Sequence, residues 1–148
     1  MEKENKVKKK ISVGIVASEK DLRDNLLLPK EISDDVPSSP YFLLIFIPRK
    51  EILKISCFPT ESNDIKKILI KLEEFSPDLV KGITEILKEL DLSKNILHTT
   101  GLCYDVDNCY YETYLSGAKI DENQIREDFM EITKVIGVDI KEAPRFSQ

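Results

Sequence analysis

The chain has 148 residues, of which 41% are hydrophobic and 33% charged, and a net charge of −5. This composition predicts a globular protein with one hydrophobic core, and the negative charge argues against a nucleic-acid-binding body, because phosphate recognition needs a basic surface. The longest apolar run, Tyr41 to Ile47, is too short to span a bilayer, and no secretion signal follows the first lysines. We expect a cytoplasmic protein that binds neither nucleic acid nor membrane.

The chain has few side chains of the types that act in catalysis or bind metals. The chain has one histidine, His98, and three cysteines, Cys57, Cys103 and Cys109, without C-x-x-C or metal-ligand spacing. No nucleophile elbow accompanies His98. We therefore expect no catalytic residue, no metal and no cofactor. We also expect the cysteines to be reduced, although a pairing of Cys103 with Cys109 across a hairpin is geometrically feasible.

The N-terminal part reads in chain order as a tail, a strand, a short helix and a loop. Residues 1–10 are predicted to be a charged, solvated tail. The apolar run Ile11–Ala17 indicates a buried strand inside the sheet, and Asp21–Leu28 suits a short helix limited by Pro29. Ser33–Pro40 has the composition of a loop.

A hairpin follows. Tyr41–Ile47 is predicted to be its central strand and Ile52–Phe58, where apolar and polar residues alternate, its more exposed strand. Residues 11–62 thus form a β-α-β-β half-unit. We expect it to be an extension packed on the same sheet as the following unit; a separate half-domain is the alternative.

The segment Ile65–Phe75 fits two patterns. The alternation of Ile68, Ile70 and Leu72 favours a strand, whereas a helical spacing would make the layers longin-like or profilin-like. Ser76 as N-cap and Pro77 as first helical residue predict a helix start at this point. The helix stripe is Leu79, Ile83, Ile86 and Leu90.

The remaining elements are a second hairpin, a helix and a last strand. The hairpin joins Ile96–Tyr104 to Cys109–Leu115. Asp121 and Gln124 indicate a capping box, and Gly137 is predicted to close the helix. That helix carries the stripe Ile125, Phe129, Ile132 and Ile136, and the last strand is Val138–Ala143.

Three tyrosines are candidates for an interface. Tyr110 and Tyr114 share one face of their strand and Tyr111 lies on the other. One sheet cannot easily bury all three rings, so we expect exposed aromatic surface and a homodimer formed through a sheet edge or a helix. The alternative is that the rings are half buried beneath a helix.

The stretch from Lys67 to Ile83, KILIKLEEFSPDLVKGI, resembles the opening of an ACT domain, and the following hairpin, helix and strand continue the resemblance to Ala143. The resemblance implies an α+β, ferredoxin-like βαββαβ sandwich over residues 63–148. It also implies a non-catalytic regulatory or sensory module that binds a small molecule, such as an amino acid, at a dimer interface. Its ligand residues would be Glu74, Phe75, Ser76, Pro77, Asp78 and Leu79.

Two alternatives concern this turn. Asp78 stands where ACT ligand sites commonly have glycine, and Glu73, Glu74 and Asp78 place three carboxylates at a helix N-terminus, where they either stabilise the helix or bind a cation or amine. The second hypothesis for function is a protein-interaction scaffold with no small ligand, in which Asp78 is a helix-start carboxylate.

Overall fold

A computed structural model of the chain describes residues 11–26, 28–117 and 119–147. The predicted tail, residues 1–10, lies outside the described residues. Within the described part, none of the helices is both long and apolar enough to cross a bilayer.

The N-terminal half forms a three-stranded antiparallel sheet, which we call sheet A. Its strand order is β1-β2-β3, so the hairpin strand β2 is central, as predicted, and β3 is the more exposed strand. The elements are β1 (Val13–Ser18), α1 (Glu19–Asn25), α2 (Lys30–Ser33), β2 (Tyr41–Pro48) and β3 (Leu53–Thr60).

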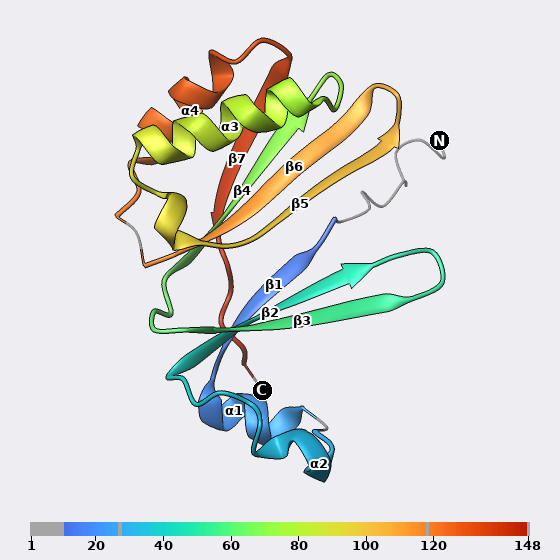
Figure 1. Cartoon of the computed structure of the whole chain (residues 1–148), viewed down its shortest axis with the longest axis vertical. Helices are drawn as coiled ribbons and strands as arrows, with labels where there is room; N and C mark the ends of the chain where they lie inside the picture. Colours follow the sequence, from blue (N-terminus) through green and yellow to red (C-terminus); the bar gives the residue numbers. More distant parts are fainter. Residues whose placement is uncertain (1–10, 27, 118, 148) are drawn as a thin grey trace.

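The C-terminal half forms a four-stranded antiparallel sheet, sheet B, with strand order β5-β6-β4-β7. Two helices cover one of its faces and sheet A lies against the other (Figure 1). The elements are β4 (Ile65–Leu72), α3 (Pro77–Glu89), a 3₁₀ turn (Ser93–Asn95), β5 (Ile96–Asp105), β6 (Asn108–Ser116), α4 (Glu122–Met130) and β7 (Val135–Glu142).

The N-terminal half does not continue the sheet of the following unit. The two halves form separate sheets that pack face to face, because β2 is apolar on both faces and needs cover on each. The inner face of β2, with Leu43 and Ile45, packs with Ile65 and Tyr114 of sheet B. The outer face forms its own cluster with α1. The described chain is therefore an α+β stack of helices, sheet B, sheet A and helices (Figure 1).

The first strand is also not inside its sheet. β1 lies at the edge of sheet A and pairs only with β2 among the named strands. The C-terminal segment covers part of this edge: the Val16 N–H donates to the Pro144 carbonyl at 2.9 Å, and the Phe146 N–H donates to the Val16 carbonyl at 2.7 Å. This contact places Phe146 beside the outer face of sheet A.

The strand prediction for Ile65–Phe75 is confirmed over Ile65–Leu72. Ser76 then caps α3, because its hydroxyl accepts a hydrogen bond from the Leu79 N–H at 3.3 Å. The buried residues of α3 are Leu79, Ile83 and Leu87, close to the predicted stripe. They pack on Ile68, Ile70 and Leu72 in the core between the helices and sheet B.

The second predicted helix is too long. Asp121 caps α4 as expected, accepting from the Gln124 N–H at 3.1 Å, but the helix ends at Met130. Lys134 takes a positive φ of 78° in the following turn, and Gly137 lies in β7, paired with Lys71 of β4. Pairing with a central strand thus outweighs the local helix-closing signal of the glycine.

Candidate functional site

The turn between β4 and α3 satisfies its own polar groups. Ser76 is engaged as the N-cap, Pro77 is the first helical residue, and Leu79 is buried in the core at 5% exposure. Glu74 accepts from the ammonium of Lys134 at 2.5 Å, and this hydrogen bond raises the pKa of Lys134. The predicted ligand residues lie together, and two of them, Glu74 and Ser76, have partners within the chain.

Phe75 closes the same turn against sheet B. Its ring lies over Gly101 of β5, where a Cβ would stand 2.3 Å from the Phe75 Cζ atom, so only glycine leaves room for the ring. Phe75 remains 41% exposed. Asp78 is exposed on the first turn of α3. Across the described residues, no three His, Cys, Asp or Glu side chains come close enough to hold a metal ion.

The three candidate interface tyrosines have different positions. Tyr110 is half-buried and makes an edge contact with Tyr104, with ring centroids 6.0 Å apart. Tyr111 packs beneath the helices at 7% exposure. Tyr114 is fully buried between the sheets, where Gly14 leaves space for its ring. The expectation of surface rings is therefore wrong for Tyr111 and Tyr114.

A polar cluster of four residues, Ser12, Lys67, Glu112 and Tyr114, joins the two sheets. The Ser12 hydroxyl donates to the Glu112 carboxylate and lies 2.7 Å from the Tyr114 hydroxyl. Lys67 lies 3.2 Å from the other Glu112 oxygen and donates to the Ser12 carbonyl at 2.8 Å. Burial raises the pKa of Tyr114. Because Ser12, Glu112 and Tyr114 have no exposed surface, this cluster holds the sheets together and offers no access to a substrate.

His98 has ordinary strand contacts. Its Nε2 atom lies 2.8 Å from the Thr100 hydroxyl, and its ring lies 5.4 Å from that of Phe58 across the two sheets. Burial lowers the pKa of His98, an effect that Glu112 opposes and Lys54 reinforces.

The expectation of reduced cysteines is wrong for two of the three. Cys103 and Cys109 are directly opposite in the β5–β6 hairpin and form a disulfide. Cys57 is free and exposed on β3, and partial burial of its thiol raises its pKa. The disulfide closes the end of sheet B, whereas the thiol lies on sheet A.

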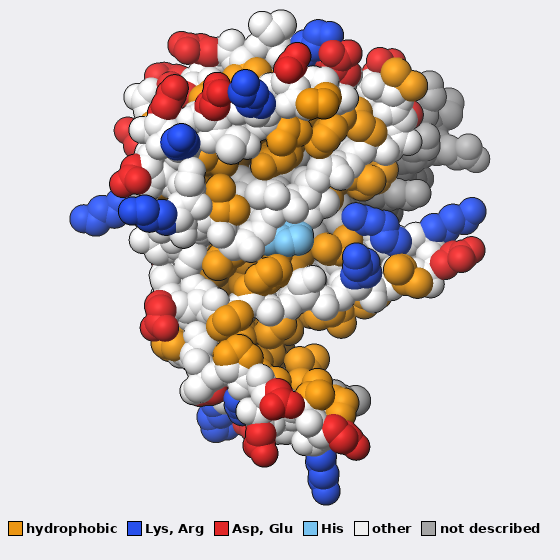
Figure 2. All heavy atoms as spheres, viewed as in Figure 1, with side chains coloured by type: hydrophobic (Ala, Val, Ile, Leu, Met, Phe, Trp, Pro, Cys, Tyr) orange, Lys and Arg blue, Asp and Glu red, His pale blue; other side chains and the backbone are white. Residues whose placement is uncertain are grey.

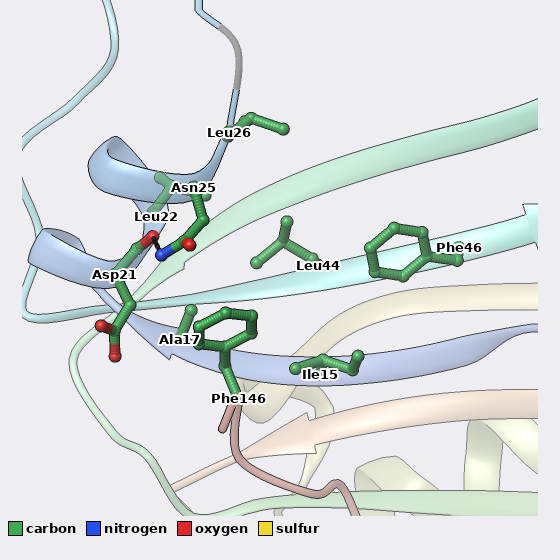
Figure 3. Close-up of a pocket in the computed structure, with 9 residues that line it drawn as sticks. All are labelled: Ile15, Ala17, Asp21, Leu22, Asn25, Leu26, Leu44, Phe46 and Phe146. Atoms are coloured by element: carbon green, nitrogen blue, oxygen red, sulfur yellow. Dashed lines mark hydrogen bonds between the residues drawn. The ribbon is translucent and has the colours of Figure 1, made fainter. Parts of the chain in front are cut away.

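A concave site lies where the sequence did not indicate one, between α1 and the outer face of sheet A (Figure 3). Its volume is about 250 Å³. Alternate residues of β1 and β2 form its floor, α1 closes one end and the C-terminal segment forms a wall. The apolar lining residues are Ile15, Ala17, Leu22, Leu26, Leu44, Phe46 and Phe146.

Two polar residues, Asp21 and Asn25, complete the closed end of this pocket. The Asn25 amide nitrogen donates to the Asp21 carbonyl at 2.7 Å, and its amide oxygen lies on the pocket side (Figure 3). The Asp21 carboxylate points away from the apolar side chains (Figure 3). The pocket thus combines apolar walls with one neutral hydrogen-bonding group, an arrangement typical of small-molecule sites.

The pocket exists because α1 is short. The sequence predicts a helix over Asp21–Leu28, but α1 spans Glu19–Asn25, capped by Ser18, whose hydroxyl accepts from the Asp21 N–H at 3.1 Å. Two turns of helix cover only one end of a three-stranded sheet. One feature of the sequence could have indicated the pocket: both faces of Tyr41–Ile47 are apolar and need a cover, which the short helix supplies only in part.

No protein-family model and no curated protein matches this chain. The chemistry of the candidate site is therefore inferred from its own residues.

Proposed function

We propose that this protein is a non-catalytic, ACT-like regulatory module that binds a small, uncharged, apolar molecule between α1 and the outer face of sheet A. The proposal keeps the class of function that the resemblance implies and moves the site. In place of the β4–α3 turn, the ligand site is the pocket of about 250 Å³.

The topology of the C-terminal half supports a ferredoxin-like, ACT-like unit. The strands joined by α3, β4 and β5, are separated by β6, and those joined by α4, β6 and β7, are separated by β4. Each helix therefore completes a split βαβ connection, the repeating unit of this architecture. Fold alone does not specify a function, so the functional proposal depends on the pocket.

The pocket is the observation that carries the proposal. An apolar cavity of about 150 Å³ already accepts a benzene ring, so a cavity of about 250 Å³ accommodates a ring with a short substituent. The Asn25 amide oxygen offers one acceptor for a ligand hydroxyl or N–H group (Figure 3). With the Asp21 carboxylate turned away, no charge faces the cavity, and a charged ligand would lose hydration without a partner.

The β4–α3 turn lacks these properties. Its N-cap Ser76 and one of its three acidic side chains, Glu74, have partners within the chain, and Phe75 occupies the space above Gly101. An amino acid bound there would have to displace these contacts. The turn is better explained as a closed helix start.

The test is a thermal-shift and calorimetric titration of the intact protein with indole, phenol and cyclohexanol, beside free amino acids and Mg²⁺. A ligand specific for the folded state raises stability by about 2.7 kcal/mol at 100 times its dissociation constant, which corresponds to a shift of several degrees. We expect shifts with the uncharged ring compounds. No shift with any of them would overturn the proposal.

Two variants locate the binding. Ile15→Trp fills the pocket from β1 and should abolish the shift, whereas Asp78→Ala, at the exposed start of α3, should leave it unchanged. A shift that persists in Ile15→Trp and disappears in Asp78→Ala would return the site to the turn. Circular dichroism of each variant establishes that the fold is intact.

A further inference from the structure

The apolar outer face of sheet A continues beyond the pocket without a cover. Opposite residues of an antiparallel pair share a face, so Val13, Phe46 and Ile55 form one row across the sheet. Val13 is 38%, Ile55 48% and Leu53 58% exposed. Hydrophobic side chains line the notch beneath sheet A (Figure 2). We call this row, with Leu53, the open face.

The two ends of the outer face carry opposite charge. At the helix end, residues 19–35 hold six carboxylates and three cations, namely Glu19, Asp21, Asp24, Glu31, Asp34 and Asp35 against Lys20, Arg23 and Lys30. At the far end, the turn between β2 and β3 holds two cations and one carboxylate, Arg49 and Lys50 against Glu51. Helices and turn lie at different ends of sheet A (Figure 1).

We propose that the open face binds a second copy of this chain in an antiparallel arrangement about a twofold axis. In such a dimer the strands of the two copies run in opposite directions across the interface. The acidic helix end of one copy therefore meets the basic β2–β3 turn of the other. Each interface then has two complementary charge contacts at its ends and an apolar centre. A single face is thereby complementary to itself.

The thickness of the layers fits this arrangement. A helix on a sheet and a sheet on a sheet both form layers about 10 Å thick. α1 therefore lies at the height that the sheet of the second copy would occupy, and the β2–β3 turn of that copy would meet the side of α1. In each copy α1 covers one end of the outer face. In the dimer the two open faces pack against each other between the α1 helices of the two copies.

The dimer also completes the pocket. The second copy would place its own Leu53 and Ile55 over the side of the cavity that leads to the open face. The dimer depends on the open face and on the end charges and needs no small molecule. A failure to bind ring compounds and a failure to dimerise are therefore separate results.

The first test is sedimentation velocity of the full chain from low to high micromolar concentration. We expect a monomer–dimer equilibrium that Ile55→Asp, on the β3 side of the open face, abolishes. The matched control is Val106→Asp, at a site 84% exposed on the β5–β6 turn, which should leave the dimer intact. A wild-type chain that stays monomeric at all concentrations would overturn the proposal, as would equal effects of the two variants.

The second test distinguishes the antiparallel dimer from other contacts. One variant reverses the turn, Arg49→Glu with Lys50→Glu, and the other reverses the helix end, Glu31→Lys with Asp35→Lys; all four positions are exposed. Each variant alone should dimerise about tenfold or more weakly at low salt, and a mixture of the two should form heterodimers, because both end contacts become attractive again. A mixture that associates no better than either variant would exclude the antiparallel arrangement.

Discussion

The two sheets of this protein both present an apolar face to helices, but the helices cover them unequally. Sheet B carries α3, of 13 residues, and α4, of nine, and its residues Ile68, Ile70 and Leu72 have no exposed surface. Sheet A carries α1, of seven residues, and its residues Leu53 and Ile55 are 58% and 48% exposed. The face of sheet B is a core, and that of sheet A is available for binding.

This difference relates the length of the connecting helices to how much of each apolar face is left exposed. Each strand set supplies enough apolar side chains to require a cover. Where the connecting helices are long, the chain provides that cover itself. Where the helix has two turns, part of the face stays exposed, and we propose that a ligand and a second copy cover it.

The largest expected effect compares equivalent truncations on the two faces. Phe129→Ala, in α4 above sheet B, should lower the free energy of unfolding by about 3–5 kcal/mol, because the ring is fully buried and its loss leaves a cavity. Ile55→Ala, on the open face, should cost less than about 1 kcal/mol when the chain is monomeric. Urea unfolding at low protein concentration measures both. Equal losses would contradict the distinction between core and open face.

The next effect concerns the contact between the sheets. Glu112→Gln should destabilise the protein by about 3 kcal/mol, because it leaves the partly buried Lys67 ammonium without its carboxylate partner. The control is Glu142→Gln, at a pair with Lys66 at 4.0 Å where the Glu142 side chain is 58% exposed; it should cost less than about 1 kcal/mol. If urea unfolding gives the same loss for both, the cluster does not hold the sheets together.

A smaller effect is expected from the disulfide at the end of sheet B. The disulfide joins residues separated by six positions in the sequence. By lowering the entropy of the unfolded chain, it raises the free energy of unfolding by about 2 kcal/mol. Reduction, or Cys103→Ser, should lower the free energy of unfolding by this amount. Cys57→Ser on sheet A should have no such effect, since its thiol is free. Stability that is unaffected by reducing agent would refute this prediction.

The smallest effect is a pH dependence at His98, where the two sheets meet. Burial, with a smaller contribution from Lys54, lowers the pKa of His98 in the folded chain, against the opposing effect of Glu112. The unfolded chain therefore binds the proton first, and stability falls as the pH drops below about 6.5. His98→Gln should reduce the difference in Tm between about pH 7.5 and 5.5. An unchanged difference would mean that other groups cause it.

Local signals in the sequence predicted the elements well. Ser76 and Asp121 act on backbone groups three residues away, so their capping roles are legible without the fold. The end of α4 was missed, because Gly137 pairs with Lys71 in β4, more than sixty residues away in the chain. The partition into two sheets was missed for the same reason, since periodicity identifies the faces of a strand but not its partners.

The candidate site was missed because it depends on contacts between distant segments. Tyr114 is buried because Gly14 leaves space for it, and the pocket wall includes Phe146, which a backbone contact holds beside β1. The predicted ligand turn was located correctly as a strand-to-helix turn. What the sequence did not indicate is that Phe75 and Glu74 already have partners there, Gly101 and Lys134.

The most direct test of the account uses Cys57, which lies on the outer face of sheet A and is the free thiol of the chain. Its alkylation by iodoacetamide is followed by mass spectrometry at low and at high protein concentration. We predict that the rate falls at high concentration as a second copy covers the face, and that Ile55→Asp removes this protection. A Cys57 rate that is independent of concentration would contradict the assignment of the open face as the interaction surface.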